Sequence, residues 1–183
     1  MMISGDTMTD KRMAEILRSI TVIIDTREQD CYHLTRFFDG KEIKYIRRKL
    51  DFGDYSFEVA PISVLQLHEP FSFERRIAIE RKHSLDELSG NLAQSRERFQ
   101  NELTRAKDAG AKLILMVEGG SWDRIIEHKY QTDLNERSYM ASLFSFIHRY
   151  NIEVQFIPSK YAGMFIFSQF YYMLREELKG LVV

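Results

Sequence analysis

The feature that most constrains the fold is a repeated alternation between short strand-type segments and longer helix-type segments. Residues 20–25 (ITVIID) are rich in β-branched side chains and are typical of a strand buried on both faces of a sheet. Helix-type segments occur between the strand-type ones along the whole chain. The alternation therefore predicts an α/β domain with a mixed central sheet flanked by helices.

The other segments follow the same alternation. Ser84, with Glu87 three residues later, forms a capping box that predicts the start of a helix, and Gly110 predicts the end of the next one. Residues 61–72 hold two of the three prolines and are expected to form a loop or an insertion. Further strands are expected at 43–49, 54–59, 76–81, 112–117 and 152–157, and helices at 31–39, 92–109, 136–150 and 161–178.

Composition sets the class of protein. The chain has 183 residues, 44% hydrophobic and 29% charged, as in a soluble globular domain. We expect residues 1–18 to be an N-terminal extension, partly disordered or a short helix, and residues 19–183 to be a single domain. A lone cysteine, Cys31, excludes an internal disulfide and a Cys-rich zinc site and indicates an intracellular setting, cytoplasm, nucleoid or nucleus. No signal peptide is expected in residues 1–9, and the most apolar stretch, 164–174, is about half a membrane span.

Three charged residues near the middle of the chain suit metal chemistry. Glu80 and Lys82 lie two apart on an expected strand, so their side chains leave the same face, and Asp54 lies at one end of the preceding strand. Carboxylates, together with a carbonyl such as that of Arg81, are the ligands that magnesium or manganese prefers. A lysine beside them can stabilise charge that grows on a phosphate. By spacing alone, these residues are equally compatible with a solvated strand face.

A larger pattern surrounds these residues. The dipeptide GD at 53–54 is followed by ERK at 80–82 and, three residues later, by Asp86, while the buried strand upstream ends in IDTRE at 24–28. This combination resembles the signature of the XPF-type (ERCC4-domain) nuclease family, GD…ERKxxxD preceded by a VDxRE-like strand end. The resemblance covers roughly residues 20–120. It implies a restriction-endonuclease-like fold and an enzyme that cuts branched DNA with magnesium or manganese.

The resemblance also implies a role for each matched residue. Asp54 and Glu80 would bind the metal, and Lys82 would be the catalytic lysine. Asp25 and Glu28 would complete the acidic cluster, by holding the metal or a metal-bound water. The matched residues that complete the set are Arg81, which would orient neighbouring acids or a phosphate and offer its carbonyl to the metal, and Asp86, which would brace the Arg81/Lys82 side. For Asp86, an ordinary acid in the first turn of a helix is an equally good interpretation.

Basic residues beside this pattern suggest how DNA is held. We expect Arg47, Arg48 and Lys49, which lead into the GD turn, to contact phosphates, together with Arg96 on the helix expected at 92–109. A solvated face without a function stays open for them. The net charge of −1 argues at first against a nucleic-acid partner. Without the four acids assigned to the metal cluster the balance would rise from −1 to +3, which favours a modest, metal-assisted contact with DNA.

The C-terminal part raises two further expectations. The helix at 161–178 is too broadly apolar for a one-sided surface helix, so it is either core or a dimer interface. The resemblance favours a homodimer or heterodimer through this helix. The tandem helix-hairpin-helix module that the family usually carries is not recognised before Val183, which leaves room for a separate DNA-binding partner and puts branched-DNA specificity in question.

The resulting hypothesis is a magnesium- or manganese-dependent endodeoxyribonuclease, structure-selective for branched or flap DNA, that acts in DNA repair or recombination. Two alternatives stay open. One is a non-catalytic DNA-binding or scaffold subunit of a nuclease complex, against which the intact acidic set and Lys82 argue. The other is a nuclease of another substrate class, restriction-like or RNA-directed, because the shape of a pocket and not the metal motif selects the substrate.

Overall fold

The computed structural model describes residues 9–61 and 68–180, and its centre is a mixed sheet of seven strands. The strand order is β2-β1-β3-β5-β6-β7, with β4 paired to β3. Strand β3 runs antiparallel to both neighbours in the main path, whereas β1 and β2, and likewise β5, β6 and β7, run parallel to each other. The strands are β1 (Ile20–Ile24), β2 (Lys44–Arg47), β3 (Tyr55–Val59), β4 (Phe71–Ser72), β5 (Ile77–Lys82), β6 (Lys112–Glu118) and β7 (Glu153–Ile157).

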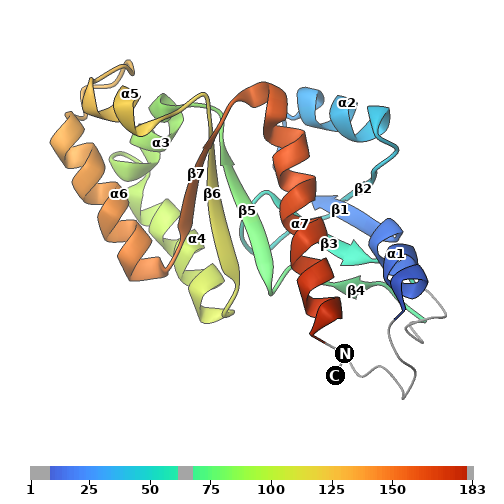
Figure 1. Cartoon of the computed structure of the whole chain (residues 1–183). Helices are drawn as coiled ribbons and strands as arrows, with labels where there is room; N and C mark the ends of the chain where they lie inside the picture. The colour runs from blue at the N-terminus through green and yellow to red at the C-terminus, as the bar shows by residue number, and fades with distance from the viewer. Residues whose placement is uncertain (1–8, 62–67, 181–183) are drawn as a thin grey trace.

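Helices cover both faces of the sheet and bury a separate apolar cluster on each (Figure 1). One face carries α1 (Asp10–Arg18), α2 (Tyr32–Gly40) and α7 (Ala162–Lys179), which the short 3₁₀ turn η2 (Ser159–Tyr161) precedes. The other face carries α3 (Leu85–Leu92), α4 (Arg96–Asp108), α5 (Trp122–Ile126) and α6 (Glu136–Tyr150). This arrangement confirms the predicted α/β class with a mixed sheet between helices.

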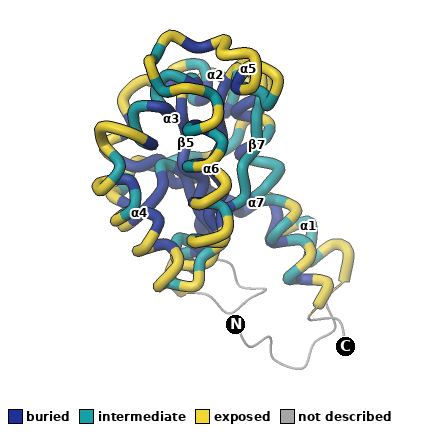
Figure 2. The backbone as a smooth tube through the Cα atoms, turned by 90° about the vertical axis from the view of Figure 1, so that its left-hand side faces the viewer, coloured by how far each residue is buried: buried dark blue, intermediate teal, exposed yellow. Residues whose placement is uncertain are grey.

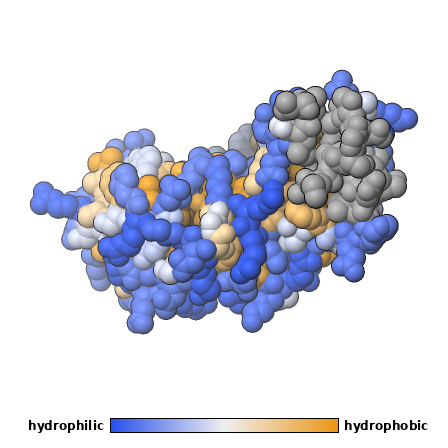
Figure 3. Space-filling view, turned by 90° about the horizontal axis from the view of Figure 1, so that it is seen from below, coloured by the Kyte–Doolittle hydropathy of each residue, from blue (hydrophilic) through white to orange (hydrophobic). Residues whose placement is uncertain are grey.

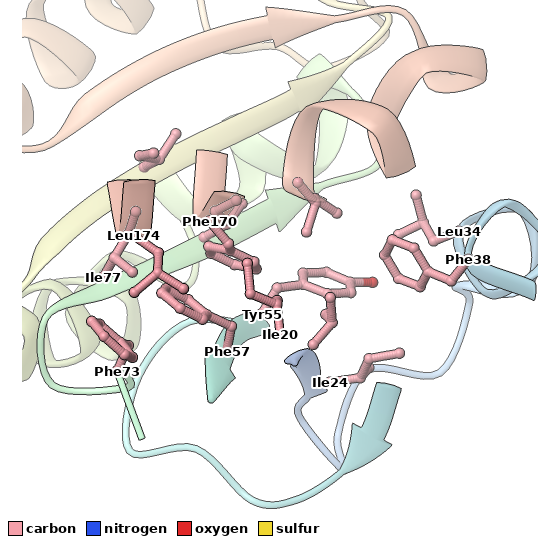
Figure 4. Close-up of a cluster of buried hydrophobic side chains, with 14 of the residues drawn as sticks. Ile20, Ile24, Leu34, Phe38, Tyr55, Phe57, Phe73, Ile77, Phe170 and Leu174 are labelled. Atoms are coloured by element: carbon pink, nitrogen blue, oxygen red, sulfur yellow. The ribbon is translucent and has the colours of Figure 1, made fainter. Parts of the chain in front are cut away.

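The cluster under α7 is rich in aromatic side chains (Figure 4). Phe57 stacks on Phe73 with ring centroids 4.3 Å apart and on Phe170 at 5.1 Å. Leu174, one turn beyond Phe170, is fully buried in the same cluster. Figure 2 shows the same division, with buried segments inside and exposed ones on the outer turns of the helices. The core interpretation of the C-terminal helix is therefore confirmed for its inner face.

Most predicted elements are present, and three segments differ. The expected loop at 61–72 is wrong at its end, because Phe71 and Ser72 pair with β3. The short helix α5 was not predicted. Helix α1 confirms the short helix in the N-terminal extension, yet it belongs to the domain, since Ile16 and Leu17 are buried in the α7 cluster. Residues 1–8, with their predicted disorder, and the middle of the 61–72 segment, 62–67, lie outside the described residues.

The outer surface has mixed hydropathy. Seen from below, it is largely hydrophilic, with apolar patches of limited extent between charged residues (Figure 3). Within the described ranges, no helix combines the length and the apolar character needed to cross a membrane. On α7, the side chains of Ile166, Phe170 and Leu174 are buried against the sheet.

The strand directions bring the motif residues to one end of the sheet. Because β1 and β5 are both antiparallel to β3, the carboxyl ends of β1 and β5 lie beside the amino end of β3. Two backbone hydrogen bonds join the three ends: Asp25 N donates to Asp54 O at 2.8 Å, and Asp54 N donates to Ile79 O at 2.9 Å. Asp25, Asp54 and Glu80 therefore become neighbours although they are far apart in the sequence.

Candidate active site

A polar cleft of about 350 Å³ opens at this end of the sheet. Its walls come from the segment after β1, the amino end of β3, the last residues of β5, and helices α3 and α4. Five of the seven predicted catalytic residues line it: Glu28, Asp54, Glu80, Arg81 and Lys82. The other lining residues are Arg27, Gln29, Asp30, His83, Glu87, Asn91, Arg98, Phe99 and Glu102.

Glu80 and Lys82 project from the same face of β5, as the spacing predicts. Lys82 Nζ donates to Glu80 Oε1 at 2.6 Å, and the ammonium lies 5.1 Å from the centre of the Phe99 ring on α4. Asp54 is fixed from the neighbouring strand end, because Arg81 N donates to Asp54 Oδ2 at 2.8 Å. The backbone of β5 thus holds Asp54 next to Glu80.

Burial strongly affects the charges in this group. Desolvation, followed by the charge of Glu80, raises the pKa of Asp54 well above its ordinary value. Desolvation raises the pKa of Glu80 to about 7, even though Lys82 opposes that rise. Burial alone would lower the pKa of Lys82, but the adjacent Glu80 carboxylate outweighs it and raises that pKa. Lys82 is therefore a charged ammonium at neutral pH, suited to electrostatic stabilisation rather than to accepting a proton.

The acidic pair fits a hard divalent cation. Glu80 Oε2 is buried and has no hydrogen-bond partner in the protein, although its other oxygen is paired with Lys82. A buried carboxylate oxygen without a partner, next to a second carboxylate, is a position that a bound cation satisfies. Among the described residues, no three His, Cys, Asp or Glu side chains converge closely enough to coordinate an ion by themselves. A carbonyl such as that of Arg81, or water, would have to complete the shell, and magnesium usually keeps several waters.

Arg81 points to the opposite face of β5 and links three segments. Its guanidinium is 2% exposed and donates to Glu28 Oε1 at 2.8 Å and to Glu118 Oε1 at 2.6 Å. A further bond reaches Asp30 O at 2.8 Å. Glu118 also lies 3.0 Å from His33 Nε2 on α2. The predicted role of Arg81 in orienting neighbouring acids agrees with this geometry, and Glu28 is one of those acids.

Two predicted site residues lie elsewhere. Asp25 is fully buried, and its carboxylate accepts from Arg27 N and Arg27 Nε at 2.7 Å and from Leu50 N at 2.6 Å, so it has no oxygen directed to the cleft. Both oxygens are thus engaged within the protein and Asp25 is not among the lining residues of the cleft, so its role as a metal ligand stays a prediction. Asp86 is in the first turn of α3 as predicted, but it accepts from Gln131 N at 2.5 Å and does not brace Arg81 or Lys82.

Three of the four predicted DNA contacts are engaged within the protein. Arg47 donates to Glu28 O at 2.7 Å, and Arg48 pairs with Glu58 at 2.8 Å. Arg96 donates to Leu92 O at 2.8 Å and stacks over a ring of α6, 4.6 Å from the centre of Phe146. The tertiary structure therefore supplies partners for all three, and their contact with DNA stays a prediction. Lys49 is exposed and lies outside the cleft lining.

Several residues of the site lie outside the motif. Glu118 ends β6, just beyond a predicted strand, so the rule that located Asp25 at a strand end could also have found it. Glu102 and Arg98 come from α4, which carries charges on several sides and offers no signal to separate them from its solvated residues. His33 becomes part of the group only because α2 packs near the end of β6.

Replacing Arg81 should destabilise the fold strongly. Arg81→Ala leaves Glu28 and Glu118 buried without their shared cation, which we expect to lower the free energy of unfolding by about 3–5 kcal/mol. Arg81→Lys should recover only part of that loss, because an ammonium cannot make the same forked set of bonds. Urea unfolding followed by circular dichroism measures both, with the exposed Arg137→Ala on α6 as the control, expected within about 0.5 kcal/mol of wild type. Equal stability of Arg81→Ala and wild type would contradict the assignment.

The stability of the metal-free protein should fall as pH rises through the neutral range. The pKa of Glu80 is about 7 in the folded protein against an ordinary 4.5, so between these values the folded state holds a proton that the unfolded state has lost. The stabilisation is present below about pH 4.5 and is lost as pH rises through about 7. In Glu80→Gln, the free energy of unfolding should decline less between these pH values. Urea unfolding at several pH values, with a chelator present, measures this. An unchanged slope would contradict the raised pKa.

Comparisons with known proteins agree with this geometry. The family model for the ERCC4 domain matches residues 24–168. A search of curated proteins found no match. Among solved structures, XPF from Aeropyrum pernix matches with a TM-score of 0.60 and 19% sequence identity over 87% of this chain and 69% of that one. XPF from the same organism in complex with DNA matches with a TM-score of 0.58 and 18% identity over 86% and 66% of the two chains. At these sequence identities, the similarity to the solved structures shows only the fold. The family is shown by the ERCC4 model, which matches most of the chain. The chain belongs to the ERCC4 domain family and has the fold of the XPF nuclease domain.

Proposed function

We propose that this chain is a divalent-metal-dependent endonuclease that hydrolyses phosphodiester bonds in DNA and selects branched or flap structures. The observation that carries the proposal is the buried, unpaired Glu80 Oε2 beside Asp54, with a charged Lys82 within 2.6 Å of the other Glu80 oxygen. Membership of a nuclease family and the likeness to a structure described as a complex with DNA support DNA as the substrate.

Asp54 and Glu80 would hold magnesium or manganese, with the Arg81 carbonyl available as a third oxygen. When bound, such an ion supplies a Lewis acid for the phosphate and a nucleophilic water near neutral pH. Lys82, kept charged by Glu80, is placed to stabilise negative charge that develops on the phosphate. Its position is further limited by the Phe99 ring below it. The Arg81 N–H holds the Asp54 carboxylate in place throughout.

The cations that line the cleft favour an anionic substrate. Arg98 and Arg27 both contribute to its walls, together with Lys82. Arg27 is itself bonded to Asp25, which fixes its guanidinium at the entrance. A phosphate backbone that passes over the acidic pair would therefore meet positive charge on the β1 side and on α4. Arg98 is the cation that we expect to replace the predicted contact at Arg96.

The nuclease proposal is tested by incubating the purified protein with labelled single-stranded, duplex, flap, splayed-arm and four-way DNA, in magnesium or manganese. We expect cleavage of branched substrates, its loss in a chelator, and a reduction of at least about 100-fold in Asp54→Asn, Glu80→Gln and Lys82→Ala. Asp108→Asn, which removes an exposed acid from α4 away from the cleft, should cleave as wild type does. DNA binding without any cleavage would support the non-catalytic alternative, and cleavage of RNA alone would overturn the substrate class.

We also propose that two copies of the chain associate through the outer face of α7. The inner face of this helix is buried in the core, but Met164 and Tyr172 on its outer face are 50% and 56% exposed. Methionine and tyrosine are both enriched in interfaces between subunits relative to the rest of a protein surface.

Light scattering coupled to size exclusion measures the association. We expect the mass of a dimer at micromolar concentration, and that of a monomer for Tyr172→Arg, which places a charge on the proposed interface without disturbing the buried face of α7. Tyr32→Arg provides the control, because Tyr32 is equally aromatic and exposed but lies on α2. A wild-type monomer at high concentration would overturn the homodimer and leave a heterodimer as the remaining form of the proposal.

A further inference from the structure

Glu102 is an acidic residue of the cleft that the motif does not contain. It comes from the middle of α4, whereas Asp54, Glu80 and Lys82 come from strand ends. Its side chain is half-buried and lines both the main cleft and a second hollow beside it, which shares Arg27 and Arg98 with the first. The buried face of helix α4 packs against β5 and β6. In this orientation, Glu102 lines the cleft at the carboxyl end of β5.

One contact of Glu102 determines how Asp54 is presented. Glu102 Oε1 accepts a hydrogen bond from Gly53 N at 3.1 Å. Gly53 has φ +70°, and a Cβ there would lie 2.9 Å from Ala78 Cβ, so no other residue fits the turn. A glycine gives the turn this shape but adds no rigidity, and the bond from α4 fixes the peptide immediately before Asp54. Glu102 therefore helps to position Asp54 through the main chain of Gly53.

Glu102 also shares the cleft with the acidic pair, because its side chain lines the same walls as Asp54, Glu80 and Lys82. The nearest cation from the β1 side, Arg27, already uses its guanidinium on Asp25 and on Leu50 O. Three acidic side chains, Asp54, Glu80 and Glu102, thus lie in the same partly buried cleft as two cations, Lys82 and Arg98, that do not already bind Asp25. This excess of negative charge is unfavourable in the protein alone and favourable for a bound divalent cation.

Building on the nuclease function proposed above, we propose that Glu102 is a positioning residue of the active site that holds the Gly53–Asp54 turn from α4 and supplies a third negative charge for divalent cation binding. Its two effects can be separated by substitution. Glu102→Gln keeps an oxygen that accepts from Gly53 N and removes the charge, whereas Glu102→Ala removes both. A bond that only stabilises the fold would be preserved in the glutamine variant.

The test measures binding of manganese to the metal-free full-length protein by isothermal titration calorimetry, without substrate. Removing a residue that supports metal ligands commonly weakens metal affinity by about 10–100-fold. We expect Glu102→Gln to raise the Kd for manganese by about 10-fold and Glu102→Ala to raise it further. Asp108→Asn removes the same charge from an exposed position on the same helix and should leave the Kd unchanged. Asp54→Asn should abolish binding and identifies the site that is titrated.

The melting temperature in the presence of a chelator distinguishes this role from a purely structural one. A residue that only stabilises the fold should lower the melting temperature when it is replaced. If Glu102 repels Glu80 in the metal-free protein, Glu102→Gln should unfold at the same temperature as wild type or higher, and manganese should raise its melting temperature less. Wild-type manganese affinity in Glu102→Gln would overturn the inference while Asp54→Asn still confirms the proposed function. A melting temperature that falls without any change in affinity would likewise overturn it. Absence of manganese binding by the wild-type protein would overturn both.

Discussion

The site depends on one buried ion group, the Arg81 guanidinium between Glu28 and Glu118. Arg81 is 2% exposed, and its bonds connect the segment after β1, the end of β5 and the end of β6. A buried arginine is tolerated only where its charge and its donors are paired, so each of these segments is held at a defined position by the others. The same residue fixes the acidic pair through its main chain, because its N–H binds Asp54.

Alternation of side chains along β5 separates structural charge from reactive charge. Arg81 faces the α2 side, where every one of its partners is satisfied. Glu80 and Lys82 face the α4 side, where one Glu80 oxygen has no partner and the carboxylates outnumber the ammonium. The ion group around Arg81 stabilises the ends of the strands. These strand ends in turn position Glu80, Asp54 and Lys82, whose excess negative charge is unfavourable without a bound cation. The net charge of −1 counts the paired charges around Arg81 and the unpaired ones around Glu80 together, and so does not distinguish them.

Part of this arrangement could be predicted from the chain. The β-branched run at 20–25 and the capping box at Ser84 are local signals, and the corresponding β1 and α3 are present. The shared face of Glu80 and Lys82 follows from strand periodicity alone. Asp25, by contrast, fits the family signature, yet its carboxylate binds Arg27, two residues away, and Leu50, which only the folded sheet brings near. Motif membership therefore identifies Asp25 but not its role.

The partners of the basic residues could not be predicted from the sequence either. Arg47, Arg48 and Arg96 look available in the sequence, because a charged side chain without a visible partner is normally solvated. In the folded protein they bind Glu28, Glu58 and Leu92, all brought near by packing. Arg98, two residues from Arg96, lies on the side of α4 that meets the cleft. A difference of two residues on a helix rotates a side chain by more than half a turn, so the orientation of α4 on the sheet decides which arginine faces the substrate.

The alternation of elements, the family signature and the acidic pair with its lysine can all be read from the chain, because each depends on residues that are near one another in the sequence or on a spaced motif. Which charged side chains are paired, and which have no partner, depends on the folded protein. The antiparallel insertion of β3 between β1 and β5 places Asp54 beside Glu80, and the packing of α4 adds Glu102 through Gly53. Pairing of buried charges depends on distances of a few ångströms between segments remote in sequence, and those distances exist only once the sheet and its helices are packed.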